Sequence, residues 1–258
     1  MFQVGALLVA IIVVHLLYVT LIRPNADVLL EEQAQRSAAG ESFVPDRSLY
    51  VVLRDYEQES CFILMLWAMA IMGYKGRNAL RERALLNDDV VQVAEGVSVL
   101  PEDSREYTRP IQALGEDDQQ MLLPRALLAA LQRFASTRNV QDVSEAVKSI
   151  CDSESDRLDS ELSLVRYIAW AIPSIGFIGT VRGIGDALGQ AYKAVEGDIA
   201  GVTASLGVAF NSTFVALVIS IVIMFLMHQL QLIQERLVLD TQVYADQRLI
   251  RHMQVRDL

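Results

Sequence analysis

Four long stretches of the chain contain no Asp, Glu, Lys or Arg, and they limit what it can fold into. They cover residues 1–22, 60–74, 167–181 and 199–234. The first and last are long enough to cross a membrane, because roughly 20 residues span a hydrocarbon core about 30 Å thick. The middle two hold 15 residues each and need Lys75 and Arg166 to extend to the headgroups. One short stretch alone could be a buried core helix, but four together predict four membrane spans.

We therefore expect an all-α, polytopic membrane protein with long helices that extend into the cytoplasm. The remaining sequence is strongly charged, with a formal net charge of -10, which separates polar from apolar segments along the chain. The first stretch lacks a basic n-region and a small-x-small cleavage site, so we interpret it as a retained span. The expected parts are transmembrane helices at 1–22, 59–75, 164–190 and 199–234, a periplasmic loop at 23–58, a cytoplasmic helical region at 76–163 and a cytoplasmic tail at 235–258.

Basic residues predict the orientation of these spans. Residues 75–166 carry twelve Lys and Arg, whereas residues 23–59 carry four and residues 182–198 carry two. Positive charge marks the cytoplasmic side of a membrane protein. Both termini are thus predicted to lie in the cytoplasm.

The predicted cytoplasmic region has two helical patterns. Leu127, Leu128, Leu131 and Phe134 recur at helical spacing, and a break is expected at 137–139. A second helix is predicted to start at Asp142, as its N-cap, and to continue without interruption into the third span.

The segment 172–189 is unusually rich in glycine for a membrane helix. Gly179 with Gly183, and Gly185 with Gly189, form small-xxx-small pairs that predict close helix packing. A dinucleotide-binding interpretation of Gly183 and Gly185 fails, because the spacing is wrong and no strand precedes them.

Hydroxyl side chains occur in the last two spans, at Thr180 and Thr213, with Asn211 and Ser212 alongside. Threonines in membrane helices often bond only to their own backbone. Their occurrence on two adjacent spans favours a polar ion pathway. The uncharged stretches supply no carboxylate, so an ion-conducting protein of this kind would need a partner chain with an intramembrane Asp.

Arg182 and Asp186 lie four residues apart and are expected to form an interfacial ion pair. An alternative is that Arg182 tunes the pKa of a partner carboxylate. The two cysteines, Cys61 and Cys151, have no metal-ligand or disulfide spacing. No Ser/His/Asp set, metal cluster or phosphate loop is recognisable, so neither an enzyme nor a cofactor is expected.

Two segments resemble the MotA/TolQ/ExbB proton channel family. Residues 173–184, which include Pro173, Gly176, Gly179, Thr180 and Gly183, resemble the third span of MotA and the second span of ExbB and TolQ. Residues 207–213 resemble the start of the final span. Two departures are Val208, where the ExbB and TolQ branches carry glutamate, and Arg182, where they carry tryptophan. These departures and the extra amino-terminal span favour a divergent member with a four-span, MotA-like layout.

The resemblance implies a pentameric ring around a dimer of single-span partners of the MotB, TolR or ExbD type, whose aspartate carries the ion. The last two spans would form the pore hairpin, with Thr180 and Thr213 lining the ion path and Pro173 at a kink linked to gating or rotation. The implied function is an ion-channel subunit of a bacterial inner-membrane rotary motor. The ion would be H⁺, or alternatively Na⁺. A non-conducting membrane scaffold or signalling subunit is the alternative function. Relatives power motility, outer-membrane energisation or phage defence, and the sequence does not distinguish among these processes.

Overall fold

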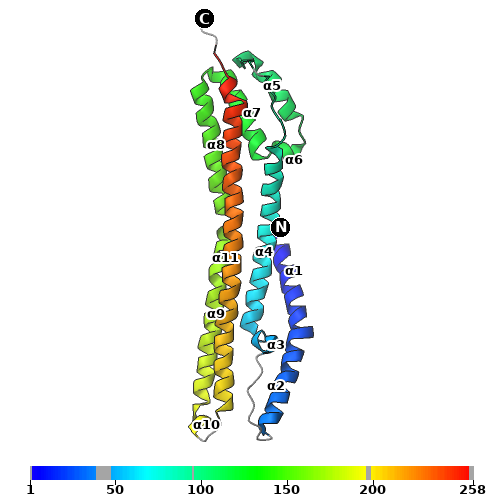
Figure 1. Ribbon diagram of the computed structural model, residues 1–258, viewed down its shortest axis with the longest axis vertical. Helices are drawn as coiled ribbons and strands as arrows, with labels where there is room; N and C mark the ends of the chain where they lie inside the picture. Colours follow the sequence, from blue (N-terminus) through cyan, green and yellow to red (C-terminus); the bar gives the residue numbers. More distant parts are fainter. Residues whose placement is uncertain (1, 39–47, 95, 196–198, 256–258) are drawn as a thin grey trace. The chain divides into compact units, whose positions relative to one another are not determined.

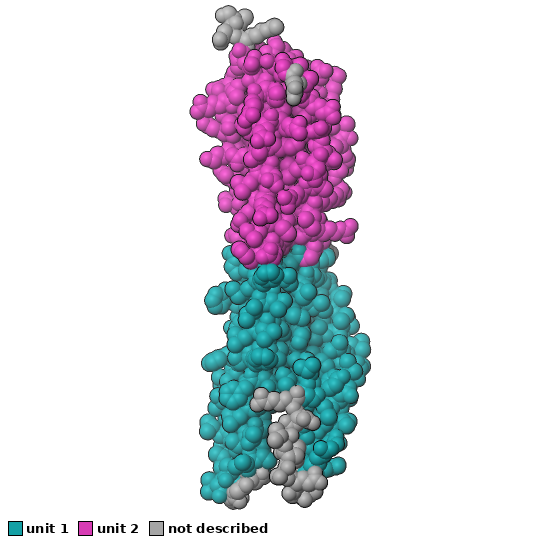
Figure 2. Space-filling view, viewed as in Figure 1, with its two compact units in different colours: residues 1–72, 164–227 teal, residues 73–163, 228–258 magenta. Residues whose placement is uncertain are grey.

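The computed structural model describes residues 2–38, 48–94, 96–195 and 199–255. These residues are helical almost throughout, and the one isolated β-bridge among them joins Val99 to Met253. The chain forms two compact units (Figure 2). Unit 1 comprises Met1–Met72 and Leu164–Met227, and unit 2 comprises Gly73–Ser163 and His228–Leu258.

Unit 1 contains the amino-terminal helices and a long helical hairpin (Figure 1). Its elements are α1 (Phe2–Leu17), the π-helix η1 (Tyr18–Ile22), α2 (Arg23–Ala38), α3 (Leu49–Val52), the first part of α4 (Tyr56–Leu85), α9 (Ser163–Gly189), α10 (Ala191–Val195) and the first part of α11 (Ala200–Arg248).

Helix continues beyond the predicted first span, residues 1–22, and passes through Pro24. The π-helical turn lets the Arg23 N–H bond to the carbonyl of Tyr18, one residue further back than in an α-helix. This register change accommodates a proline, which has no N–H to donate. The predicted periplasmic loop is consequently helical over α2 and again over α3, and its residues 39–47 lie outside the described part.

Unit 2 is a helical bundle around one hydrophobic core. It contains the second part of α4, η2 (Pro101–Asp103), α5 (Ser104–Gln112), α6 (Glu116–Gln119), α7 (Leu122–Thr137), α8 (Val140–Glu161), the end of α11 and η3 (Ile250–His252). Leu127, Leu131 and Phe134 are fully buried in this core, as their spacing predicts, and Leu128 packs against it. The segment 235–258 was expected to be a tail. Instead, Val238, Ala245, Leu249, Ile250 and Met253 belong to the core.

The break between α7 and α8 is confirmed, but the residue that begins α8 differs from the prediction. Arg138 adopts the left-handed conformation with φ 54°, which ends α7. Asn139, not Asp142, is the N-cap, and its Oδ1 accepts the Gln141 N–H at 2.9 Å. An Asn directly after the left-handed residue can cap the helix three residues earlier than Asp142 could. The helix predicted to continue into the third span has one turn residue, Leu162, between α8 and α9.

Three helices of the described chain are long and apolar enough to cross a membrane: Phe2–Gln33, Val140–Gly189 and Ala200–His252. The predicted second span, at 59–75 within α4, is not among them, because Glu59 and Lys75 leave only 15 uncharged residues between them. It stays a prediction.

The hairpin of α9 and α11 is packed at glycine contacts. A Cβ atom on Gly183 would lie 2.7 Å from the Ser205 carbonyl oxygen and 2.8 Å from Ala209. Gly176 and Gly179 meet Ala216 and Ser212 of α11 in the same way. Gly185 and Gly189 were predicted to pack too, but a Cβ on either would meet no described atom within 4 Å. The packing stripe is therefore 176, 179 and 183, which follows the 3.6-residue period of one helix face.

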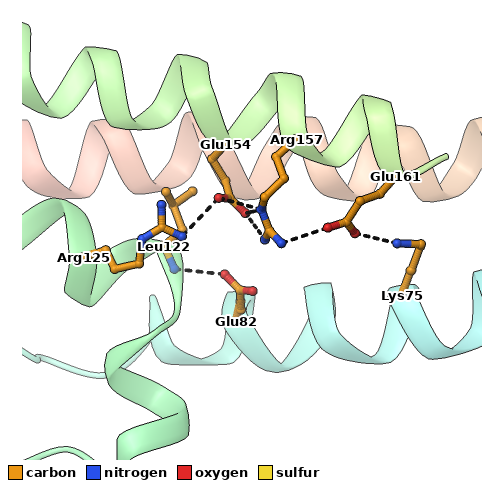
Figure 3. A network of polar contacts seen from close by, with 7 residues as sticks. All are labelled: Lys75, Glu82, Leu122, Arg125, Glu154, Arg157 and Glu161. Carbon is orange, nitrogen blue, oxygen red and sulfur yellow. Dashed lines mark hydrogen bonds and ion pairs between the residues drawn. The ribbon is translucent and has the colours of Figure 1, made fainter. Parts of the chain in front are cut away.

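Ion pairs surround the place in unit 2 where α4, α7 and α8 meet (Figure 3). Glu154 on α8 is almost fully buried and pairs with Arg125 of α7 at 3.2 Å and with Arg157 one turn later. Arg157 also pairs with Glu161, which reaches Lys75 of α4. The buried carboxylate is thereby matched by two guanidinium groups, as burial of a charge requires.

A neighbouring carboxylate caps α7 from another helix. Met121, the N-cap residue of α7, has no side chain that could accept a hydrogen bond. Glu82 of α4 supplies the acceptor, and its Oε2 lies 3.1 Å from the Leu122 nitrogen. Burial raises the pKa of Glu82, and the hydrogen bond from Leu122 partly offsets that rise.

Two substitutions of Glu82 test separately its role as the cap of α7 and the effect of its buried charge. We expect Glu82→Ala to destabilise unit 2 by about 1 kcal/mol, the usual cost of a lost N-cap. Glu82→Gln keeps an acceptor oxygen and removes the buried charge. Because the raised pKa makes ionisation costlier in the folded protein, wild-type stability falls as the pH rises through that pKa, and Glu82→Gln should lose less stability over that interval. Thermal unfolding of the purified protein as a function of pH, with the exposed Glu145→Ala as control, measures both effects. Equal stability of Glu82→Ala and the control would contradict the cap.

Two glycines of α9 form a matched pair for the packing. Gly183→Ala should destabilise the hairpin by about 1–3 kcal/mol, because the new methyl group overlaps α11 backbone. Gly185→Ala should leave stability unchanged or raise it by up to about 1 kcal/mol, since alanine favours a helix over glycine. Unfolding midpoints in detergent compare the two variants, and similar effects would contradict the packing.

Candidate ion pathway

The two predicted threonines meet between the helices of the hairpin. The Thr180 hydroxyl of α9 hydrogen-bonds the Thr213 hydroxyl of α11. Thr180 Oγ1 also lies 3.0 Å from the Ala209 carbonyl oxygen of the opposite helix, and Thr213 Oγ1 lies 3.1 Å from the Gly176 carbonyl oxygen of its opposite helix. These contacts cross from one helix to the other. Thr180 Oγ1 also lies 3.3 Å from the Gly176 carbonyl oxygen of its own helix, so it has acceptors on both helices.

Each hydroxyl has one proton and two lone pairs. Thr180 can donate to Gly176, Ala209 or Thr213, but to only one at a time. The remaining lone pairs accept hydrogen bonds. The pair can therefore change donors without moving either helix, which is the chemistry that a hydrogen-bonded path for protons or a hydrated cation needs.

The neighbours Ser212 and Asn211 behave differently. Ser212 is buried, donates to the Val208 carbonyl oxygen at 3.0 Å and is approached by the Gln58 amide of α4. Asn211 is partly buried, and the hydrogen bonds found within the described chain do not join it to the threonine pair. The structure thus brings Thr180 and Thr213 together, whereas the hydrogen bonds of Ser212 go to Val208 and Gln58.

Arg182 does not form the ion pair that its sequence spacing suggested. Its Nε and Nη2 lie 2.8 and 2.9 Å from the two carboxylate oxygens of Glu57, and Asp55 lies 3.7 Å away. Asp186 is exposed on the same helix, and the ion pairs of Arg182 found among the described residues are with Glu57 and Asp55 instead. A two-pronged pair with a carboxylate from another segment holds a guanidinium better than an i, i+4 contact on one helix face. Sequence spacing could not reveal these partners, because more than 120 residues separate them from Arg182.

Another carboxylate joins the amino-terminal helices to α4. Glu59 accepts from Arg23 and lies 2.7 Å from His15 Nδ1. Arg23 also stacks over the rings of Tyr18 and Tyr56, with its guanidinium carbon 5.6 and 4.3 Å from their centroids. The acidic side chains Glu57 and Glu59 of unit 1 are consequently both engaged by cationic side chains.

Pro173 interrupts the hydrogen bonds of α9, and sequence reasoning missed how the interruption is repaired. A proline removes the bond to the carbonyl four residues earlier, here Ala169. The hydroxyl of Ser220 on α11 donates to that carbonyl at 3.1 Å, and Ser174 donates to the next one, Trp170, at 3.0 Å. A serine opposite a helix proline is the signal that could have indicated this contact.

A double-mutant cycle tests the repair. Ser220→Ala leaves the Ala169 carbonyl without its donor and should cost about 1 kcal/mol of stability. Pro173→Ala restores a backbone N–H to that carbonyl, so Ser220→Ala should cost almost nothing in its presence. Unfolding midpoints of the four proteins give the coupling. Ser174→Ala is the control that leaves Ala169 bonded, and full additivity of Pro173→Ala and Ser220→Ala would show that the two residues do not share a carbonyl.

Comparison with known proteins finds a family model that matches part of the chain. Residues 118–242, which include α7 to α9 and the threonine pair, match the model of the MotA/TolQ/ExbB proton channel family. No curated protein matches the chain, and no solved structure does. The family consists of proton channels and is generally not enzymatic. Together, the match over just under half of the chain and the three membrane-length helices support a membrane protein that is related to the MotA/TolQ/ExbB proton channel family.

Proposed function

We propose that the chain is the ion-conducting subunit of a rotary motor in the bacterial inner membrane. The observation that carries the proposal is the contact of Thr180 with Thr213 between α9 and α11. Two hydroxyls that bond to each other and to carbonyls of opposite helices can pass hydrogen bonds along a path. Protons are the proposed ion, and Na⁺ is the alternative.

The carboxylate that binds the ion comes from another chain in this proposal. Within unit 1, Glu57 is paired with Arg182, and Glu59 is paired with Arg23 and His15. Both carboxylate oxygens of Glu57 are engaged by Arg182, and those of Glu59 are engaged by Arg23 and His15, so neither glutamate offers a free oxygen to an ion. A single-span partner of the MotB, TolR or ExbD type, present as a dimer, supplies the free aspartate.

The apolar outer face of the hairpin supports assembly into a ring, which we propose to be a pentamer. Large apolar side chains on α9 and α11 are exposed in the single chain, including Trp170, Phe177, Phe210, Phe214 and Phe225. Lipid or neighbouring subunits must cover such a surface. In the proposed topology both termini lie in the cytoplasm, together with unit 2, and the predicted span at 59–75 crosses the membrane as the second of four.

Mutation of the threonine pair tests conduction. Thr180→Ala and Thr213→Val should each lower ion flux at least tenfold without preventing assembly, because each removes a hydroxyl and leaves the helix intact. The measurement is H⁺ or Na⁺ flux into liposomes that contain the chain and its single-span partner, with Thr203→Ala as control, since that hydroxyl bonds only to Ile199 of its own helix.

Native mass spectrometry of the same preparation counts the subunits. Five copies with two single-span chains would support the motor. Normal flux in both threonine variants would exclude the threonine pair from the path, and a ring that binds no partner and passes no ion would indicate a scaffold.

A further inference from the structure

The first turn of α4 places polar side chains where a membrane protein usually has apolar ones. Glu57, Gln58 and Glu59 are consecutive. The Glu57 side chain is only 12% exposed, and the whole residues Gln58 and Glu59 are 1% and 6% exposed. Each points to a different neighbour. Glu57 pairs with Arg182 of α9, Glu59 pairs with Arg23 and His15, and Gln58 reaches Ser212 of α11. The two glutamates therefore have charged partners, and Gln58 needs a separate explanation.

The amide of Gln58 is satisfied at one end only. Its Nε2 donates to the Val52 carbonyl oxygen at 3.1 Å and approaches Ser212 Oγ at 3.5 Å. Its Oε1 is buried and has no hydrogen-bond partner among the described residues. Exchange of the two amide atoms would leave the Val52 carbonyl facing an oxygen, so the assigned orientation is the favourable one.

Ser212 adds a second acceptor at the same place. Its single proton goes to Val208, and Gln58 Nε2 approaches its oxygen, which leaves that oxygen with one free lone pair. Gln58 Oε1 is therefore the acceptor that has no donor among the described residues, and Ser212 Oγ can accept one further hydrogen bond. Buried acceptors without donors are rare in native proteins and are commonly met by an ordered water or an ion.

The charges around this place favour a cation. The carboxylates of Glu57 and Asp55 both pair with the guanidinium of Arg182, and Arg54, the residue before Asp55, pairs with Asp27. These three carboxylates and two guanidinium groups leave a formal excess of one negative charge. Gly179 permits the approach, since a Cβ there would lie 2.6 Å from Ser212 and 3.1 Å from Glu57 Cγ. Ser212 also precedes Thr213 of the threonine pair directly in the chain.

We propose that Gln58 and Ser212 form a binding station for the hydrated transported cation, a hydronium or Na⁺ with its water, beside the threonine pair. This inference rests on the proposed function and extends the ion path to a third helix, α4. Gln58 Oε1 accepts from the incoming water or hydronium, Ser212 Oγ is the second acceptor, and the Glu57, Asp55 and Arg182 cluster sets a negative potential next to them.

Flux through liposomes that contain the complete complex tests the station. Gln58→Met keeps the length of the side chain and removes both amide atoms, so flux should fall about tenfold, the effect of losing one hydrogen bond to a charged guest. Ser60→Ala is the matched control on the same helix, because its hydroxyl bonds only to the Tyr56 carbonyl oxygen, and flux should not change.

A second variant and a stability measurement guard against misfolding. Ser212→Ala removes the other acceptor next to the close contact at Gly179, and it should lower flux by a similar factor. The unfolding temperature shows whether the Gln58→Met complex is folded, and flux at the wild-type rate through a folded Gln58→Met complex would overturn the inference.

The outcomes separate the station from the proposed function. If Thr213→Val stops flux and Gln58→Met does not, the station is wrong and the channel stands. If the wild-type complex passes neither H⁺ nor Na⁺, both fail. If the effect of Gln58→Met is seen for protons in a sodium-free medium, the guest is hydronium or water; if it requires sodium, the guest is hydrated Na⁺.

Discussion

The close approach of α9 and α11 determines almost everything else in the hairpin. Where Gly176, Gly179 and Gly183 face α11, the two backbones come near enough for side chains of one helix to reach carbonyl groups of the other. Thr180 bonds to Ala209, Thr213 bonds to Gly176, and Ser220 bonds to Ala169. Larger residues in the glycine stripe would separate the helices by more than a hydrogen bond can span. Small residues at a membrane helix interface therefore organise polar contacts as well as packing.

A second set of contacts ties the hairpin to the start of α4. Charged side chains in a membrane protein are costly unless they are paired, and Arg182 and Arg23 each find a carboxylate on that helix, with His15 Nδ1 in contact with the carboxylate that Arg23 binds. These pairs hold the first turn of α4 against its neighbours. They also engage the carboxylates of Glu57 and Glu59, so in the proposed motor the carboxylate that carries the ion comes from another chain.

Local sequence patterns predicted much of this arrangement. The glycine spacing, the two threonines and the break at 137–139 follow from helical periodicity and composition, which depend on neighbouring residues only. The partners of Arg182, the Ser220 contact with the proline-freed carbonyl and the Glu82 cap on α7 join segments far apart in sequence, and a single sequence carries little information on such pairs. The packing of residues 235–258 into the core of unit 2 was missed for a related reason. Its apolar residues, such as Val238 and Leu249, are spread among charged ones, so they look solvated until the core they complete is known.

The repair of the proline gap in α9 has a consequence for how easily that helix can bend. In an uninterrupted helix, a change of direction must stretch several backbone bonds together. At Pro173 the backbone bond is already missing, and a freely rotating hydroxyl on a different helix, Ser220, holds the Ala169 carbonyl. A hydroxyl rotates about its own C–O bond, so it can keep a hydrogen bond over a range of carbonyl directions that a backbone N–H, fixed in the helix, cannot follow. A bend of α9 at Pro173 would therefore stretch fewer backbone hydrogen bonds than a bend elsewhere in the helix, while the Ser220 contact still ties that level of α9 to α11.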